Sequence, residues 1–290
     1  MRIAILSNHR SGRGRAGRLA LRLQLALHDA GHTCWQAETV ASESDARLPG
    51  VIRDAQLVIV CGGDGSLRTC ARAARDAGAM LWHAAAGTEN LFARHFAMRG
   101  LRGLMRGIEA GETAELDVWG ADGHAFLVMA SVGLDADIVC EVAARRRGPQ
   151  ARRHWVAPIV RGALGWRAPE CTVSSVDGSV VSRQRGSFIA ANLPAYAARM
   201  NPVVRAEGSD GALDALTLRC RGAFGLLPWA ARGWMGLTGG SCMRLPEPAC
   251  VVQTDRSCRW QIDGCPLPGG ARGAVELRRD GDRLRVLLPG

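Results

Sequence analysis

The stretch LVIVCGGDGSLRT, residues 57 to 69, most constrains what this chain can fold into. It opens with an apolar run typical of a strand buried on both faces, and the run stops at Gly62. Gly62, Gly63 and Gly65 then surround one acid, Asp64. Glycines at the end of a parallel strand let backbone N–H groups approach an anion, and the next helix adds its dipole. The stretch therefore predicts a phosphate-binding turn, with a plain glycine-rich connection as the alternative.

Asp64 needs an explanation of its own, because a carboxylate does not bind phosphate directly. It can serve a metal ion that accompanies the phosphates, or it can brace the loop. Both readings stay open at this point.

The first third of the chain alternates strand and helix patterns. Strand patterns occupy 2–7, 33–36, 57–61 and 79–84, and helix patterns occupy 19–30, 71–76 and 91–98. Such alternation requires crossovers between parallel strands, so it predicts a doubly wound parallel sheet.

From about residue 114 the pattern changes to short strands separated by turns. Asp122-Gly123 and Asp177-Gly178 each lie between apolar runs, which is typical of a β-hairpin. Helical inserts are expected at 135–147 and 224–237. We therefore predict an α/β nucleotide-binding domain over 1–113 and a mainly antiparallel β-sandwich that holds the substrate over 114–290.

Composition narrows the class of partner. The 290 residues carry a formal charge of +10, and every positive side chain is an arginine, which favours polyanionic partners. One Tyr and five Phe do not supply the stacking platforms of nucleic-acid modules, so no nucleic acid is expected. The ten cysteines lie mostly in apolar runs without a CxxC pair, which predicts reduced thiols and no zinc site. Without an apolar span or a signal-peptide pattern, we expect a cytoplasmic protein.

Two further loops should join the glycine turn. SNHRSGRGRAG, residues 7–17, follows the first strand pattern, and AAAGTENLFARHF, residues 84–96, follows a later one. Ligands of open α/β sheets bind outside the carboxyl ends of the strands, so the three loops are expected to converge. None of them is a GxxxxGK[ST] motif, which a chain without lysine cannot form.

These segments resemble the diacylglycerol kinase catalytic family, which includes bacterial lipid kinases, ceramide kinases and sphingosine kinases. GGDGS at 62–66 and GTENLFAR at 87–94 are similar to its GGDGT and GTxND(F/L)AR motifs. The resemblance continues, in order, through NHRSG (8–12), VGLDADI (132–138), SDGALDALTL (209–218) and QIDGCPL (261–267). GGDG also occurs in NAD kinases and phosphofructokinases, but the later segments favour the lipid kinase branch.

The resemblance implies an ATP- and Mg²⁺-dependent kinase with its active site between two domains. Asp64 and Asp135 would order the magnesium ion and the region between the domains, and Asp263 would accept the hydroxyl proton. Asp210 would bind a structural Mg²⁺ beside the carbonyls of Glu207 and Ala212. For Asp210 and Asp263 an ordinary Asp-Gly turn is the alternative. Ribose and phosphates would lie against Asn8, Ser11, Gly12, Thr39, Gly62, Gly63, Asp64, Gly65, Ser66, Leu67, Arg68 and Thr88.

Two departures from the family pattern keep other functions open. Leu91 stands where many relatives carry the aspartate of GTxND, and Cys265 stands where DGE has its glutamate. A thiol with an unperturbed pKa of about 8.5 is mostly protonated near neutrality and does not replace a carboxylate. The leading hypothesis is a kinase for diacylglycerol or a related long-chain lipid alcohol. The alternatives are a catalytically silent nucleotide- and lipid-binding member and an NAD kinase.

The segment ARRRGPQARRHWVAP, residues 144–158, suggests contact with a membrane. Its arginines and tryptophan, Arg145, Arg146, Arg147, Arg152, Arg153 and Trp155, suit anionic headgroups at the inner face of the membrane. The alternative is a solvated loop with Trp155 folded beneath it.

Overall fold

The computed structural model describes residues 1–8, 14–39, 46–145 and 156–290, and it divides into two compact units. Among the described residues, the first unit contains Met1–Leu116 and Asp282–Gly290, and the second contains 117–145 and 156–281. The first segment thus ends three residues beyond the predicted boundary at 113. The end of the chain also differs from the prediction, since the last nine residues return to the first unit.

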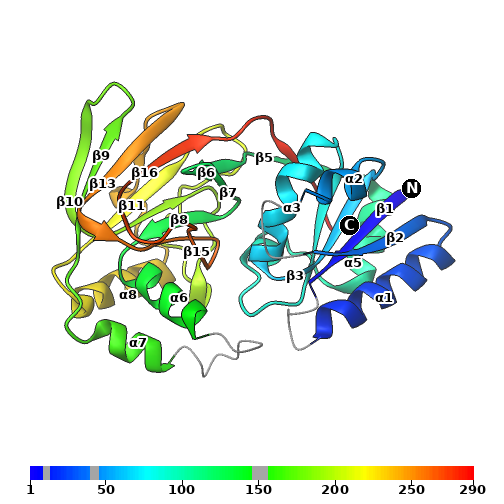
Figure 1. The fold of residues 1–290 in the computed structure, drawn as a ribbon, viewed down its shortest axis with the longest axis horizontal. Coiled ribbons are helices and arrows are strands. Elements are labelled where there is room, and N and C mark those ends of the chain that lie inside the picture. Colours follow the sequence, from blue (N-terminus) through cyan, green and yellow to red (C-terminus); the bar gives the residue numbers. More distant parts are fainter. Residues whose placement is uncertain (9–13, 40–45, 146–155) are drawn as a thin grey trace. The chain divides into compact units, whose positions relative to one another are not determined.

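The first unit is built on a mostly parallel sheet, as the alternating pattern predicts (Figure 1). The strand order is β2-β1-β3-β4-β17-β5, in which only β5 runs antiparallel to its neighbour. Every residue of β3 is buried, which explains its unbroken apolar run. The strands are β1 (Arg2–Ser7), β2 (Thr33–Glu38), β3 (Leu57–Gly62), β4 (Met80–Ala85), β5 (Thr113–Leu116) and β17 (Leu284–Leu287).

Helices cover both faces of this sheet. Helix α1 packs against β1, β2 and β3, and α3 packs against β3, β4 and β17. Right-handed crossovers in this strand order place α1 on one face and α3 on the other. Helix α1 buries Ala16, Ala20, Leu23 and Leu27, which recur at the spacing of one helical face. The helices are α1 (Arg15–Asp29), α2 (Leu48–Ile52), α3 (Asp64–Asp76), α4 (Leu91–His95) and α5 (Gly100–Ala110).

Helix α5 was not predicted, because three glycines in GLRGLMRGIEA obscure its periodicity. The structure explains one of them. A Cβ on Gly107 would lie 2.3 Å from the Leu288 carbonyl oxygen, so the glycine lets α5 approach the returning end of the chain.

The second unit is an antiparallel sheet that turns back on itself. Strand β10 (Val180–Ala191) belongs to both halves, since residues 180–185 pair with β9 while 186–191 pair with β11. Gly186 marks the change of partner, and a Cβ there would lie 2.2 Å from the Leu218 carbonyl oxygen. The predicted Asp-Gly turns connect β6 to β7 and β9 to β10.

The path of this sheet is β15-β14-β8-β10-β9-β13-β16-β6-β7, with β11 and β12 branching from β10. Its strands are β6 (Trp119–Ala121), β7 (His124–Phe126), β8 (Met129–Val132), β9 (Glu170–Ser175), β11 (Asp214–Arg219), β12 (Met243–Arg244), β13 (Ala249–Cys258), β14 (Trp260–Ile262), β15 (Cys265–Pro266) and β16 (Arg272–Arg279).

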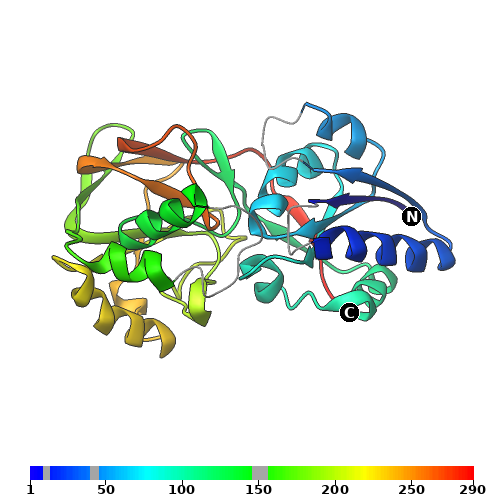
Figure 2. The ribbon, with the colours of Figure 1, turned by 60° about the horizontal axis from the view of Figure 1, so that its bottom comes forward.

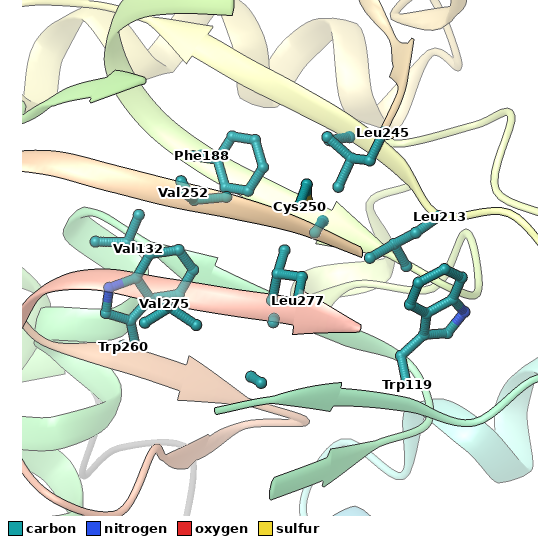
Figure 3. Close-up of a cluster of buried hydrophobic side chains, with 14 of the residues drawn as sticks. Trp119, Val132, Phe188, Leu213, Leu245, Cys250, Val252, Trp260, Val275 and Leu277 are labelled. Carbon is teal, nitrogen blue, oxygen red and sulfur yellow. The ribbon is translucent and has the colours of Figure 1, made fainter. Parts of the chain in front are cut away.

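The core of the second unit lies between the two halves of the sheet (Figure 3). Phe188 and Trp260 meet there with ring centroids 6.4 Å apart, and Val252, Val275 and Leu277 fill the space around them. Because successive side chains along each strand point alternately inward and outward, one shared core fixes the register of both halves.

Helices flank this sheet at 134–144 and 227–234, close to the predicted inserts. The helical elements are α6 (Leu134–Ala144), α7 (Val156–Ala163), α8 (Leu227–Trp234) and the short 3-10 turns η3 (Ala197–Arg199), η4 (Ala223–Leu226) and η5 (Gly239–Ser241). Within the part of the chain that the structure describes, none of the helices is long and apolar enough to cross a bilayer.

Candidate functional site

Three strands end side by side at the carboxyl edge of the first sheet. The register pairs Ser7 with Cys61 and Gly62 with Ala85, so β1, β3 and β4 end side by side. In the order β2-β1-β3-β4, the chain adds β2 on one side of β1 and adds β3 and β4 on the other side. The position between β1 and β3 is therefore the topological switch point, where open α/β sheets bind ligands. The expected convergence of the loops after β3 and β4 is therefore present.

Asp64 ties two of these loops together. Its Oδ2 accepts a hydrogen bond from the N–H of Leu91, and its Oδ1 accepts one from the N–H of Phe92, both at 3.0 Å. The carboxylate thereby holds the start of α4 against the start of α3. The sequence left two roles open for Asp64, metal binding and bracing of the loop, and this geometry supports the bracing role. Asp64 binds the backbone N–H of residue 91, so the contact does not depend on an acidic side chain at that position.

A close backbone contact completes the junction. A Cβ on Gly87 would lie 2.6 Å from the Cα of Gly63 and 2.8 Å from the Asn90 side-chain oxygen. Asn90 closes the turn, because its side chain accepts from the Gly87 N–H at 2.9 Å and donates to the Gly87 carbonyl at 3.0 Å. Gly87 is therefore required by the close approach of the two loops.

Polar side chains line the same edge. Asn8 donates to the Ser66 hydroxyl at 3.1 Å, and Thr39 is bonded through its backbone to Ser7. The Thr39 hydroxyl is buried and has no hydrogen-bond partner among the described residues. A buried hydroxyl without a partner is costly unless a ligand or water supplies one. Ser11 and Gly12 lie outside the described residues.

Helix α3 starts directly at the glycine turn. The N–H groups of Ser66 and Leu67 both bond to the Gly63 carbonyl, whereas those of Asp64 and Gly65 precede any intrahelical acceptor. Such N–H groups and the helix dipole favour an anion. Leu67 and Arg68 are both buried in α3. Of the two, only Arg68 has a charged side chain that suits a phosphate. Thr88 lies in the facing loop.

His83 lies beneath the turn and was not anticipated. It is fully buried in β4, and its Nε2 lies 3.1 Å from the Gly62 carbonyl oxygen. Burial lowers its pKa, and the nearby Asp64 carboxylate offsets part of that effect. The sequence shows only an apolar strand at this place, so nothing signalled the contact.

The second unit holds a separate polar cluster around Asp135. Its Oδ2 accepts from the Ser131 hydroxyl at 2.5 Å and from the Tyr196 hydroxyl at 2.8 Å, with the Gln261 amide at 3.5 Å. Its Oδ1 is shielded from solvent and has no partner in the described part of the chain. Burial raises the pKa of this carboxyl, and the hydrogen bonds offset part of the rise. Ser131, Tyr196 and Gln261 were not identified from the sequence.

Asp263 has a different environment. One carboxylate oxygen accepts from the N–H of Leu127 at 2.8 Å, and the other accepts from Val128 and Met129 at 2.9 Å each. The residue is 4 % exposed and adopts a left-handed conformation at φ 47°. Three of about four lone-pair positions are thus taken by peptide groups. This geometry favours the Asp-Gly turn over the proton acceptor, and Asp263 fixes the turn after β14.

Asp210 does not offer a free carboxylate to a metal ion. Its Oδ2 is paired with the Arg244 guanidinium, and its Oδ1 accepts from the Ala212 N–H at 3.0 Å. The Glu207 carbonyl accepts from the N–H of Asp210 itself at 3.4 Å. The residues expected to hold a structural magnesium ion therefore form a closed turn, and as arranged they do not fit such an ion.

No group of three or more His, Cys, Asp and Glu side chains in the described ranges could hold a metal ion. Magnesium is commonly bound through one or two carboxylates together with substrate phosphates, and Asp64 offers one carboxylate next to the phosphate-type turn. A magnesium ion that arrives with a nucleotide is compatible with this edge.

The first unit is an α/β domain with a glycine turn at the carboxyl edge of its sheet, and the second unit is an antiparallel β sheet. Residues 2–121 match the model of the diacylglycerol kinase catalytic domain. No curated protein matches the chain.

Two solved structures from Bacillus anthracis str. Sterne share the whole architecture. One, of a protein assigned as a diacylglycerol kinase, aligns with a TM-score of 0.74 at 15% identity and covers 99% of this chain and 97% of that one. Another, called a diacylglycerol kinase, gives 0.69 at 16% identity and covers 99% and 96%. At this identity the likeness shows the fold, and it extends through the second unit.

Proposed function

We propose that the protein is an ATP-dependent lipid kinase that transfers the γ-phosphate to the hydroxyl of diacylglycerol or a related long-chain lipid alcohol. The observation that carries the proposal is the start of α3, where two N–H groups without intrahelical acceptors follow a glycine turn held by Asp64. That turn lies inside the segment that matches the diacylglycerol kinase catalytic domain.

On the nucleotide side, the chain would bind phosphates with peptide N–H groups of the turn and with Arg68. Asn8, Thr39 and Thr88 would contact the rest of the nucleotide, and the unpartnered Thr39 hydroxyl supports this assignment. Magnesium, bound with the nucleotide, would neutralise charge on the transferred group, and Asp64 is the carboxylate placed to accompany it.

On the acceptor side, we assign the lipid hydroxyl to Asp135 in preference to Asp263. The Asp135 carboxyl keeps one oxygen without a partner in the described residues, and burial raises its pKa, which makes it a better proton acceptor. Tyr196 and Ser131 hold the other oxygen, so they orient the group. Peripheral contact with a membrane belongs to the same proposal, since the acceptor resides in a bilayer.

A catalytically silent nucleotide- and lipid-binding protein is the second candidate. It is favoured by Leu91 and Cys265, which replace two acids of the family pattern, and by the engagement of both Asp64 oxygens by peptide groups. This candidate predicts ATP binding without turnover.

The test is the transfer of labelled γ-phosphate from ATP to a mixed lipid extract in the presence of Mg²⁺. Wild type, Asp135→Asn and Asp64→Ala are compared, with ATP binding measured in parallel. We expect a labelled lipid with the wild type, a loss of at least about a hundredfold for Asp135→Asn with ATP binding retained, and weakened ATP binding for Asp64→Ala.

The other outcomes separate the alternatives. ATP binding that fails only in Asp64→Ala, with no label in any lipid, identifies the silent protein. Label in NAD with none in lipid identifies an NAD kinase and rejects the lipid acceptor.

A further inference from the structure

A pocket lined by arginines lies in the second unit, against the start of α6. It has a volume of about 240 Å³, and its walls include Arg167, Arg256 and Arg259 together with Trp166 and Asp137. Trp166 donates its indole N–H to Asp137 at 3.2 Å, and Arg259 contacts the other oxygen of that carboxylate at 3.0 Å. The wall is therefore fixed by a tryptophan and an ion pair.

Positive charge exceeds negative charge around this pocket. Asp255 is shared by Arg256 at 3.3 Å and Arg185 at 3.1 Å, and Arg256 also donates to the Arg167 carbonyl. The Arg167 guanidinium itself bonds to no residue that the structure describes. Three arginines therefore line the pocket against one lining carboxylate, Asp137. Nearby, Glu170 is shared in the same way as Asp255, by Arg183 and Arg185. The pocket can accept an anionic group.

Exposed apolar side chains border the arginines. The backbone of Arg167 bridges to Gly222, and the N–H of Ala168 donates to the Arg221 carbonyl at 3.1 Å, so the end of the α7 segment lies beside η4. Leu164 is 71% exposed, Phe224 81% and Leu227 65%. Helices α7 and α8 lie at the same end of the second unit in both ribbon views (Figure 2).

The segment that contains η4 and α8 also lacks acidic residues. Between Asp214 and Glu247 the sequence has four arginines and no Asp or Glu, and α8 exposes Trp234 in addition to Leu227. Large apolar side chains that are exposed together mark interaction surfaces. Arginine and tryptophan beside them suit the headgroup region of a bilayer with negative charge.

We propose that this surface, formed by the arginine pocket and by the apolar rim of Leu164, Phe224 and Leu227, docks on an anionic phospholipid bilayer. The guanidinium groups of Arg167, Arg256 and Arg259 bind lipid phosphate, and the rim inserts among the acyl chains. The inference rests on the proposed function, of which membrane contact is a part, and deepens it by naming the docking surface. Docking itself requires neither ATP nor a phosphate acceptor. It also assigns membrane contact to residues other than the run at 145–155, of which 146–155 lie outside the described residues.

The test is sedimentation of the full chain with vesicles of phosphatidylcholine containing phosphatidylglycerol, without ATP or diacylglycerol. Vesicles of phosphatidylcholine alone serve as the neutral comparison. Binding to the anionic vesicles is expected to fall about fivefold for each of Arg167→Gln and Arg259→Gln. Phe224→Ser combined with Leu227→Ser is expected to weaken it at least about tenfold.

Matched controls come from the same unit. Arg278→Gln removes an exposed arginine on β16, and Val180→Ser removes a side chain that is 58% exposed at the β9–β10 hairpin. Both are expected to bind like the wild type, and thermal melting of every variant confirms the fold. Equal loss in controls and test variants would overturn the assignment to this surface.

Two other results would also overturn it. If inorganic phosphate binds the pocket and abolishes vesicle binding while the rim variants bind normally, the pocket serves a soluble anion. If the rim variants change only self-association in sedimentation velocity, the face pairs with a second copy. Since no assay here contains ATP, a failure of docking and a failure of the kinase proposal are distinguishable.

Discussion

Three aspartates singled out by the sequence differ in what their oxygens contact. Peptide N–H groups take both oxygens of Asp64 and of Asp263, whereas Asp135 keeps one oxygen shielded and without a partner in the described part of the chain. The sequence could mark all three, since each lies next to a turn or at a helix start. It could not assign the roles of Asp64 and Asp263, because the N–H groups that bind their carboxylates come from residues 27 or more positions away.

Asp263→Asn tests the structural role of the carboxylate. An amide places N–H₂ where an oxygen now accepts a peptide N–H, so a buried donor loses its partner. The free energy of unfolding is expected to fall by about 2–3 kcal/mol, measured by urea denaturation. Asp282→Asn, at an exposed carboxylate, is the control and should change stability by less than about 0.5 kcal/mol. An Asp263→Asn protein with wild-type stability and no phosphate transfer would instead restore the residue as proton acceptor.

His83 makes the stability of the first unit depend on pH. Burial lowers its folded pKa below the value of 6.5 that it has when exposed, so below about pH 6.5 the unfolded chain binds more protons than the folded one. The contribution of neutral His83 to the stability of the first unit is therefore fully present above that pH and is lost as the pH falls. Denaturation at pH 5.0 and 7.5 should show a smaller difference for His83→Gln than for wild type. His32 and His95, whose pKa values burial also lowers, are present in both proteins and cancel in the comparison.

At the scale of elements, periodicity predicted β1, β2, β3 and β4 of the first sheet and the Asp-Gly hairpins of the second unit. Two features of α5 and β10 could not be predicted from periodicity. Helix α5 carries Gly107, which its packing against Leu288 requires, and β10 changes partners at Gly186. Both depend on contacts between segments far apart in the sequence, which local patterns do not contain.

Gly87→Ala tests the contact between the loops that follow β3 and β4. The added methyl would lie 2.6 Å from Gly63, so the loops must separate, and we expect a loss of about 1–3 kcal/mol in stability together with weaker ATP binding. Gly50→Ala in α2 is the matched control, because its methyl meets nothing within 4 Å and should stabilise the helix by about 0.5–1 kcal/mol. Unchanged ATP affinity and stability in Gly87→Ala would show that the two loops can separate without a loss of free energy of folding.

At the scale of the whole molecule, the end of the chain completes the unit in which the chain begins. Strand β17 lies between β4 and β5, and its Leu284, Val286 and Leu287 are fully buried. The sequence predicted a change of architecture near residue 114 but assigned 282–290 to the second domain. The apolar run at 284–287 predicts a strand, but its sequence does not indicate which of the two sheets that strand joins.

This topology predicts that residues 1–116 alone do not form a stable unit, because β5 loses its neighbour and the apolar face that β17 covers is exposed. Leu116 and Leu284 are directly opposite in the antiparallel pair, so a short Asn-Gly turn can replace 117–283 and join β5 to β17 as a hairpin. We expect the joined protein to unfold cooperatively in urea and to bind ATP, whereas 1–116 shows neither property. Cooperative unfolding of 1–116 with the same midpoint would mean that β17 adds nothing to the first unit. The joined protein with Val286→Asp is the control, since a charge in the buried strand should return it to the behaviour of the truncated chain.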